Sequence, residues 1–174
     1  MQYRIVKYLN NPILERPADP VREFDTPDLH QLVADMFETM YASHGVGLAA
    51  PQIDVNKRLT VIDITGGEEG KEPERLVLIN PEVIAKDGKQ TGEEGCLSIP
   101  GFREPVTRAK TATIRAQDVR GKWFEVEGED LLARAMLHEI DHLNGILFLS
   151  HLSSLKRDLI RRKIRKLQKA GEWE

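Results

Sequence analysis

The 174-residue chain has a single cysteine, Cys96, and therefore cannot form an intrachain disulfide. Long apolar runs are also missing, because none approaches the roughly 20 residues that a membrane span requires. The first seven residues, MQYRIVK, show neither the apolar core of a signal peptide nor the Arg- and Ser-rich composition of a transit sequence. These absences argue against a membrane partner and make a cytoplasmic protein the default expectation.

The composition is ordinary, with 40% hydrophobic and 30% charged residues, and the length favours one domain over residues 1–174. The charge distribution is uneven. Residues 156–169 hold eight basic side chains and one acidic one, which leaves 17 of the 25 basic and 27 of the 28 acidic residues to the rest of the chain. The body is thus acidic and the C-terminal segment is basic.

An N-terminal helix is predicted after an irregular arm at residues 10–25. Thr26, Pro27 and Asp28 supply a capping hydroxyl, a proline in the first turn and an acid near the positive end of the helix dipole. The apolar residues that follow are spaced for one helix face: Leu29, Leu32, Val33, Met36, Phe37 and Met40. Gly45 is expected to end this helix.

The middle of the chain is rich in strand signals. Residues 58–64 and 75–80 are β-rich and flank an acidic, glycine-rich loop, and Asp87-Gly88 predicts a hairpin turn between residues 82–86 and 91–98. Residues 111–118 and 123–127 predict an antiparallel hairpin. Strands that occur in runs between separated helices favour an α+β fold over parallel βαβ units.

Two further helices are predicted near the C-terminus. One spans residues 130–144 and ends at Gly145, and the other is an amphipathic helix whose outer face, within residues 156–174, is basic. The expected architecture is antiparallel β-sheets packed around the first of these helices, with an N-terminal helix and a C-terminal amphipathic helix.

The helix at residues 130–144 contains the sequence HEIDH at positions 138–142. Residues four apart lie on the same helix face, so His138 and His142 can point at one metal ion. Glu139 is offset by about 100° and could take a proton from bound water. The alternative is a polar surface turn, or two core histidines satisfied by hydrogen bonds. Burying so many polar groups in an apolar helix is costly unless they have partners.

Two histidines need at least a third ligand to hold a divalent ion firmly. A lone thiol is a small core residue, a nucleophile or a metal ligand, and Cys96, between Gly95 and Leu97, is the residue to suspect. A thiolate with two imidazoles leaves a fourth position for water, which is the form of a catalytic metal site.

The segment GVGLAAPQ at residues 45–52 is made mostly of small residues, and its two glycines permit close approach of the backbone to a partner. The alternative is a plain loop between helix and strand. A Gly-x-Gly pair without a full phosphate-binding pattern is weak evidence for a nucleotide.

Together, GVGLAAPQ at 45–52, EGCLS at 94–98 and HEIDH at 138–142 closely resemble the three motifs of peptide deformylases, in the same order and at similar separations. The resemblance covers essentially the whole chain, and LSIP at 97–100 is similar to the bacterial type with a helical C-terminus. It implies hydrolysis of the N-terminal formyl group of formyl-methionyl nascent peptides, with release of formate.

The resemblance also implies residue roles. Cys96, His138 and His142 would ligate the metal, and Glu139 would be the general acid and base for a metal-bound water that attacks the formyl carbon. Gln52 and the backbone N–H of Leu97 would hold the oxyanion. The substrate-binding positions implied are Val46, Gly47, Glu94, Gly95, Arg103 and Leu131. Asp141 is expected to lie off the ligand face.

One position departs from the family pattern. Arg134 stands one helical turn before His138, where the methionine pocket of the family usually has an apolar wall. We expect its aliphatic stem to line the pocket and its charged head to stay in water.

The implied cofactor is one divalent metal ion per chain. A Cys/His₂ ligand set suits Zn²⁺, while the family implies Fe²⁺ as the native ion, with Ni²⁺ or Co²⁺ tolerated in a purified sample. The basic C-terminal segment is either a solvated helix face or a contact with the ribosome, which would suit a co-translational enzyme.

Three alternatives remain open from the residues alone. A zincin-like peptidase would use the same histidines with a distant His or Glu as third ligand. A thiol hydrolase would use Cys96 as nucleophile, which leaves Glu139 and the second histidine without a role. The third alternative is a metal-binding or ribosome-associated module without catalysis, although every proposed catalytic position holds a competent residue.

Overall fold

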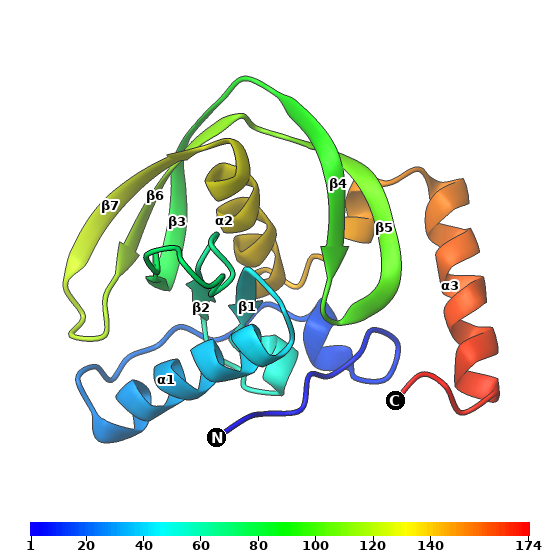
Figure 1. Ribbon diagram of the computed structural model, residues 1–174, viewed down its shortest axis with the longest axis horizontal. Coiled ribbons are helices and arrows are strands. Elements are labelled where there is room, and N and C mark those ends of the chain that lie inside the picture. Colours follow the sequence, from blue (N-terminus) through cyan, green and yellow to red (C-terminus); the bar gives the residue numbers. More distant parts are fainter.

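The computed structural model describes residues 1–174 and places helix α2 (Asp130–Leu143) between two antiparallel β-sheets (Figure 1). The other helices are η1 (Pro12–Glu15), α1 (Pro27–Ala42), η2 (Ala50–Ile53), η3 (Phe148–His151) and α3 (Ser154–Lys169), where η marks a 3₁₀ helix. The strands are β1 (Gly47–Ala49), β2 (Leu59–Ile62), β3 (Leu76–Asp87), β4 (Gln90–Cys96), β5 (Ile99–Arg108), β6 (Thr111–Gln117) and β7 (Trp123–Glu129). The α+β prediction is confirmed.

The larger sheet has the strand order β1-β2-β3-β6-β7, and the smaller one is the pair β4-β5. The predicted hairpin across Asp87-Gly88 is wrong, because β3 pairs with β2 and β6 while β4 pairs only with β5. Gly88 does adopt a left-handed φ of 67°. Asp87-Gly88 therefore forms a turn, as predicted, but this turn leads the chain from the larger sheet into the smaller one. A turn motif specifies local backbone geometry and not the sheet that the next strand joins.

Strand β5 was not foreseen, since its sequence IPGFREPVTR contains two prolines and a glycine. Such residues weaken a strand signal, yet proline is tolerated at a sheet edge. Pro105 lies opposite Glu93 in a sheet of only two strands, so both strands are edges.

Helix α1 begins as predicted, with the Thr26 hydroxyl accepting a hydrogen bond from the N–H of Leu29. It ends earlier than Gly45, because His44 takes the left-handed φ of 59°. The N–H groups of His44 and Gly45 then bond the carbonyls of Tyr41 and Met40, a Schellman ending. Gly45 is required for packing and not for ending the helix, because a Cβ at this position would lie 2.8 Å from Cδ1 of Leu97.

Three large hydrophobic clusters pack against the two sheets, and a small one joins Ala18, Ala49 and Leu143. Helix α1 packs on β1 and β2, and α2 packs its buried residues Ala133, Met136 and Ile140 against β2, β3 and β6. The third cluster joins the N-terminal arm, β5, η3 and α3. Helix α2 is therefore fixed by core packing on one side, which leaves its other side for the site.

Helix α3 forms one end of the molecule (Figure 1). Its Ile160 and Ile164 are buried, and Trp173 beyond it donates from Nε1 to the carbonyl of Tyr8 over 2.8 Å. The predicted amphipathic helix is confirmed, and it is an integral part of the core. None of the helices combines the length and the apolar character needed to cross a bilayer.

The acidic loop after β2 is anchored by Asp63, which is fully buried. Its carboxylate accepts hydrogen bonds from the N–H and hydroxyl of Thr65, from the N–H of Glu74 and from the hydroxyl of Tyr41. Burial alone would raise the pKa of Asp63, but the bonds from Thr65 and Tyr41 outweigh it and lower the pKa. The ionised carboxylate thus stabilises the folded chain.

We predict that Asp63→Asn lowers the free energy of unfolding of the metal-free protein by about 1–2 kcal/mol at pH 7, because bonds to a charged acceptor are replaced by weaker ones. Since the folded-state pKa of Asp63 is lowered, this contribution is present above the unfolded value near 4 and is lost as the pH falls below it. Urea denaturation should therefore show a gap between wild type and variant that narrows towards pH 3.

Glu68→Gln is the matched control, because this carboxylate in the same loop is exposed and pairs only with Lys71. It should stay within about 0.5 kcal/mol of wild type. A gap for Asp63→Asn that is absent at pH 7, or that widens at low pH, would contradict the anchoring role.

Candidate metal centre

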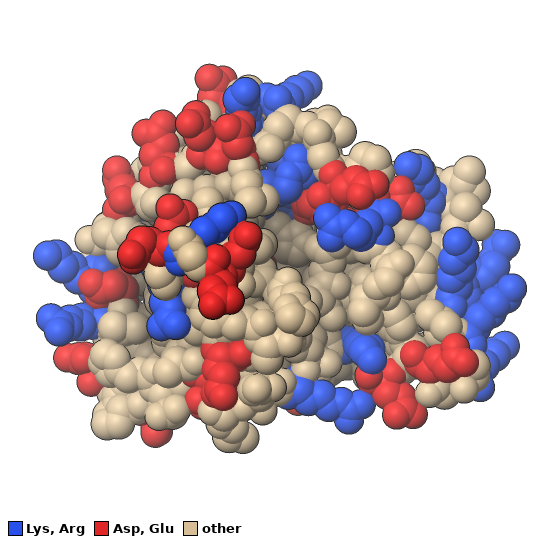
Figure 2. Space-filling view, in the orientation of Figure 1, with Lys and Arg blue, Asp and Glu red and all other residues tan.

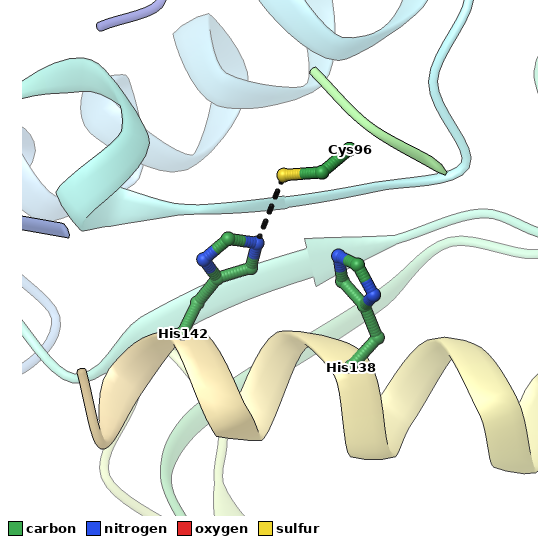
Figure 3. A group of neighbouring side chains, drawn as sticks. All are labelled: Cys96, His138 and His142. Carbon is green, nitrogen blue, oxygen red and sulfur yellow. Dashed lines mark hydrogen bonds between the residues drawn. The ribbon is translucent and has the colours of Figure 1, made fainter. Parts of the chain in front are cut away.

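Helix α2 carries His138 and His142 one turn apart on the side away from its core packing, and both rings lie towards Cys96 (Figure 3). The Nδ1 atom of His138 lies 2.8 Å from Oε1 of Glu94. If Nδ1 carries the proton, Nε2 of His138 is left with its lone pair for a metal ion. The two histidines thus share one helix face, as the four-residue spacing predicts.

Cys96 ends β4 and enters the two-residue turn to β5. Its Sγ lies 3.3 Å from Nε2 of His142, and the ligand atoms of Cys96, His138 and His142 lie within 4.8 Å of one another. The turn is held in place by the carbonyl of Ser98, which accepts from the N–H of Tyr8 over 2.9 Å. The arm near the N-terminus therefore helps to position the thiol.

These three residues fit a divalent ion by their chemistry and their surroundings. Burial would lower the pKa of His138, but hydrogen bonds to Cys96 and Glu94 raise it to about 10, so these groups stabilise a positive charge that a divalent ion would supply in place of the proton. Burial lowers the pKa of His142 well below its usual value, which keeps its imidazole neutral, as a metal ligand must be. A thiolate and two imidazoles are ligands suited to zinc and iron.

The buried carboxylate of Glu94 contacts His138 and two arginines. Arg108 donates to both of its oxygens, from Nε over 2.6 Å and from Nη2 over 3.0 Å, while Nη1 of Arg134 lies 2.5 Å from Oε2. Burial alone would raise the pKa of Glu94, but its bonds with His138 and Arg108 lower it to about 2. Glu94 is therefore ionised and orients the His138 ring. Glu94 also lines the cavity described below, and its role in substrate binding stays a prediction.

Asp141 lies off the ligand face, as predicted. Its Oδ2 accepts from Nη1 of Arg108 over 3.0 Å and lies 2.9 Å from Nε2 of His151. The carboxylate therefore holds the second side of the Arg108 guanidinium and connects α2 with η3.

Glu139 is 4% exposed, and its Oε1 has no hydrogen-bond partner among the protein groups. Burial raises its pKa to about 7, against the opposing influence of His138. A carboxylate with such a pKa can both accept and deliver a proton near neutral pH. It fits beside the backbone because residue 47 is glycine: a Cβ on Gly47 would lie 2.5 Å from Oε2 of Glu139.

Gln52 reaches the site from η2. The N–H of Ala49 donates to its Oε1 over 2.9 Å, and this bond turns the Nε2 amide towards Sγ of Cys96, 3.5 Å away, and Oγ of Ser98, 3.2 Å away. The side chain is 2% exposed. The amide thus presents donors at the edge of the ligand cluster, in a fixed orientation.

These groups border one cavity of about 540 Å³. In Figure 2 the hollow near the centre of this face is bordered by charged side chains. Every predicted site residue lines the cavity except His142, which is 1% exposed and lies beneath it. The predicted residues that line it are Val46, Gly47, Gln52, Glu94, Gly95, Cys96, Leu97, Arg103, Leu131, His138 and Glu139.

The sequence reasoning missed several other lining residues, among them Ile99, Phe102 and Ala135. Ala135 could have been found, because it shares a helix face with Leu131 and His138 at the i+4 and i+3 spacings. Ile99 and Phe102 could not, since they belong to β5, which carried no clear strand signal.

The expectation for Arg134 is half wrong. The residue lines the cavity, but its head does not stay in water: the residue is 8% exposed, and Nη1 bonds Glu94 and the carbonyl of Val106 over 3.0 Å. Its guanidinium is drawn inside because Glu94 offers a buried negative charge. Gly92 also leaves room, since a Cβ there would lie 3.3 Å from Nη2.

Comparisons with known proteins agree with this geometry. The family model of polypeptide deformylases matches residues 3–158. A peptide deformylase of Acidobacterium capsulatum is 57% identical over 97% of both chains. A crystal structure of a peptide deformylase from Legionella pneumophila covers 100% of this chain and 99% of its own, with 46% identity and a TM-score of 0.88. The crystal structure of the Thermus thermophilus peptide deformylase covers 95% of both chains, with 40% identity and a TM-score of 0.84.

We predict that Glu94→Gln weakens metal binding by about 10–100-fold, because the variant loses the charge that orients His138. Competition with a chelating dye, using Zn²⁺ or Ni²⁺, measures the affinity, and circular dichroism shows whether the variant has folded. Glu93→Gln is the control, since that neighbouring carboxylate is 66% exposed and its one ion pair is with Arg103, at 3.8 Å. A folded Glu94→Gln protein with wild-type affinity would contradict the assigned role.

Proposed function

The chain belongs to the peptide deformylase family, and from this premise we propose that it hydrolyses the N-formyl group of formyl-methionyl nascent peptides in a metal-dependent reaction, with release of formate. The observation that carries the proposal is the buried, unpartnered carboxylate of Glu139 beside the cluster of Cys96, His138 and His142. Family membership supports the reaction, and the arrangement of these side chains supports the roles below.

Cys96, His138 and His142 would hold one divalent ion. When bound, such an ion lowers the pKa of water towards about 7 and polarises a carbonyl oxygen, which is what a weakly electrophilic formamide requires. We propose Fe²⁺ as the native ion, with Zn²⁺, Ni²⁺ or Co²⁺ able to occupy the same ligands in a purified sample.

Glu139 would carry the proton. The side chain of Glu139 lines the cavity, so its carboxylate can meet a water molecule there, while Oε1 is buried without a protein partner. A pKa near 7 suits acceptance and then release of a proton. It would accept a proton as the attacking oxygen forms its bond to carbon. It would then deliver that proton to the leaving amine of methionine, so that one group serves both halves of the reaction.

The oxyanion would be held by Gln52 and Leu97. The amide of Gln52 is already oriented by Ala49 and needs no reorganisation to donate from Nε2. Leu97 lies in the tight turn after Cys96, next to the ligand cluster, so its N–H is available at the same point of the cavity. A donor of this kind is worth roughly 3–4 kcal/mol in the transition state of comparable sites.

The peptide would lie along β1. This strand is the edge of the larger sheet, paired on one side with β2, and its other side adjoins the cavity lined by Val46 and Gly47. An extended substrate could pair with that free edge, a form of β-augmentation. Leu131 is 49% exposed at the cavity and offers apolar surface, while Gly95 and Arg103 border the cavity on the side of β4 and β5.

The rival chemistries make different use of the same residues. A zincin-like peptidase would leave Cys96 as packing, yet its Sγ lies within the ligand cluster. A thiol hydrolase would need no metal, so its activity would survive a chelator. Internal cleavage of the peptide would indicate the peptidase, and activity that survives a chelator would indicate the thiol hydrolase.

We further propose that α3 contacts the ribosome, which would place the enzyme in the cytoplasm beside emerging chains. The exposed basic side chains of α3 line the outer edge of the molecule in Figure 2, opposite to its packed face at Ile160 and Ile164. Such a surface suits the phosphate backbone of RNA.

We predict that Glu139→Gln retains one metal ion per chain but loses at least about 100-fold in turnover of formyl-Met-Ala-Ser, because the variant lacks the proton carrier but keeps every ligand. The assay is anaerobic release of formate, with mass spectrometry to exclude internal cleavage and a chelator arm for wild type. Glu125→Gln, an exposed carboxylate on β7, is the control. Near-normal turnover of metal-loaded Glu139→Gln, or chelator-resistant wild-type activity, would overturn the mechanism.

A charge-neutralised α3 tests the ribosome proposal without removing the buried residues of the helix. The substituted positions are exposed and become Gln: Arg162, Lys163, Lys166 and Lys169. We predict weaker co-sedimentation with ribosomes and a shallower dependence on salt, with unchanged hydrolysis of the tripeptide. The control replaces four exposed lysines elsewhere: Lys57, Lys71, Lys86 and Lys122. Equal binding by both variants would refute a specific role for α3.

A further inference from the structure

Arg134 forms part of the wall where the first side chain of a substrate would lie. It stands one helical turn before the ligand His138, and both line the same cavity. One turn of an α-helix advances about 5.4 Å, the scale of an extended methionine side chain. A side chain that starts near the metal ligands and runs along α2 therefore ends beside Arg134.

The guanidinium of Arg134 is only partly used by the protein. All three of its hydrogen bonds start from Nη1, and they reach Glu94, the carbonyl of Val106 and, at 3.4 Å, that of Gly92. Nε and Nη2 make no hydrogen bond to the protein, and neither atom is closed off from solvent. These N–H groups are thus reachable, in a side chain held in position by Nη1.

The charges around Arg134 are compatible with a further hydrogen-bond acceptor at its Nε and Nη2. Glu94 is the nearest carboxylate, but its Oε1 already faces Nη2 of Arg108 and Nδ1 of His138, and its Oε2 faces Nε of Arg108 and Nη1 of Arg134. An incoming oxygen would therefore meet donors of Arg134 beside a carboxylate whose charge is already matched by two arginines.

We propose that Arg134 is a specificity-determining residue that lets the enzyme accept formyl peptides whose first residue is methionine sulfoxide, because Nε and Nη2 can donate to the sulfoxide oxygen. The inference rests on the proposed function and names a further substrate class for the same site. The sulfoxide oxygen is bonded to Sδ, near the end of the side chain, where the Arg134 donors lie. The reaction at the formyl group is unchanged.

A different account makes Arg134 only a structural tie between α2 and the β4–β5 pair. That account predicts lower stability when Arg134 is replaced, but no change in the choice between substrates of equal length. The test must therefore measure a ratio between two substrates and not the activity of one.

Wild-type enzyme is assayed first on formyl-Met(O)-Ala-Ser and formyl-Met-Ala-Ser. We expect kcat/KM values within about tenfold of each other. A pocket without a donor would reject the sulfoxide by about 100-fold or more, because the oxygen would be buried unpaired. Rejection of that size would overturn the proposal without any variant. Absence of formate from both peptides would instead refute the proposed function, and this inference with it.

The second arm is a competition between formyl-Met(O)-Ala-Ser and formyl-norleucyl-Ala-Ser in one tube, read by mass spectrometry. The product ratio does not depend on how much enzyme is active or metal-loaded. Arg134→Leu should shift the ratio about tenfold or more towards norleucine, and Arg134→Lys should restore part of it. Arg103→Leu, the other arginine at the cavity, should leave the ratio unchanged. A ratio within twofold of wild type for Arg134→Leu, or an equal shift for Arg103→Leu, would overturn the assignment.

Discussion

The carboxylate of Glu94 is the interaction on which the site depends. It stands on β4, receives Arg108 from β5, and receives both Arg134 and His138 from α2. One buried anion thus joins the two-stranded sheet to the helix that packs against the five-stranded one. Without it, Arg134 would be left with an unpaired buried charge and Arg108 would keep only Asp141 as an acidic partner, which is costly in a protein interior. The same anion orients His138, one of the three proposed metal ligands, so the stability of the sheet junction and the geometry of the site share one cause.

The partners of each carboxylate explain why Glu139 behaves differently from Glu94 within the same site. Glu94 has two arginines and a histidine as partners, and its pKa falls to about 2. Glu139 is as deeply buried but lacks any donor on Oε1, and its pKa rises to about 7. The surroundings thus shift the pKa values of the two glutamates in opposite directions. Such a difference is typical of a site in which one carboxylate is a structural anion and the other can carry a proton.

Much of this arrangement could be read from the sequence, and the part that could not has a physical reason. Helix periodicity placed His138 and His142 on one face, the lone thiol between Gly95 and Leu97 pointed to Cys96, and the family resemblance implied Gln52. The strand β5 was missed because its prolines and glycine weaken any local signal, and its place is set by pairing with β4. Arg134 was expected to reach water because long charged side chains usually do. Its actual partner, Glu94, lies forty residues away, and no local pattern connects the two.

Gly47 shows how the proposed substrate-binding edge and the proposed proton carrier constrain one another. In the proposed reaction the outer edge of β1 must remain free for an extended peptide, and the carboxylate of Glu139 must reach the reacting bond of that peptide. Both conditions meet at residue 47, where a Cβ would overlap Oε2 of Glu139 at 2.5 Å. The glycine therefore brings the backbone that would pair with substrate into contact with the group that would move the proton. In the proposed function, peptide binding and proton transfer therefore depend on the same close approach, and a larger residue at position 47 would disturb both.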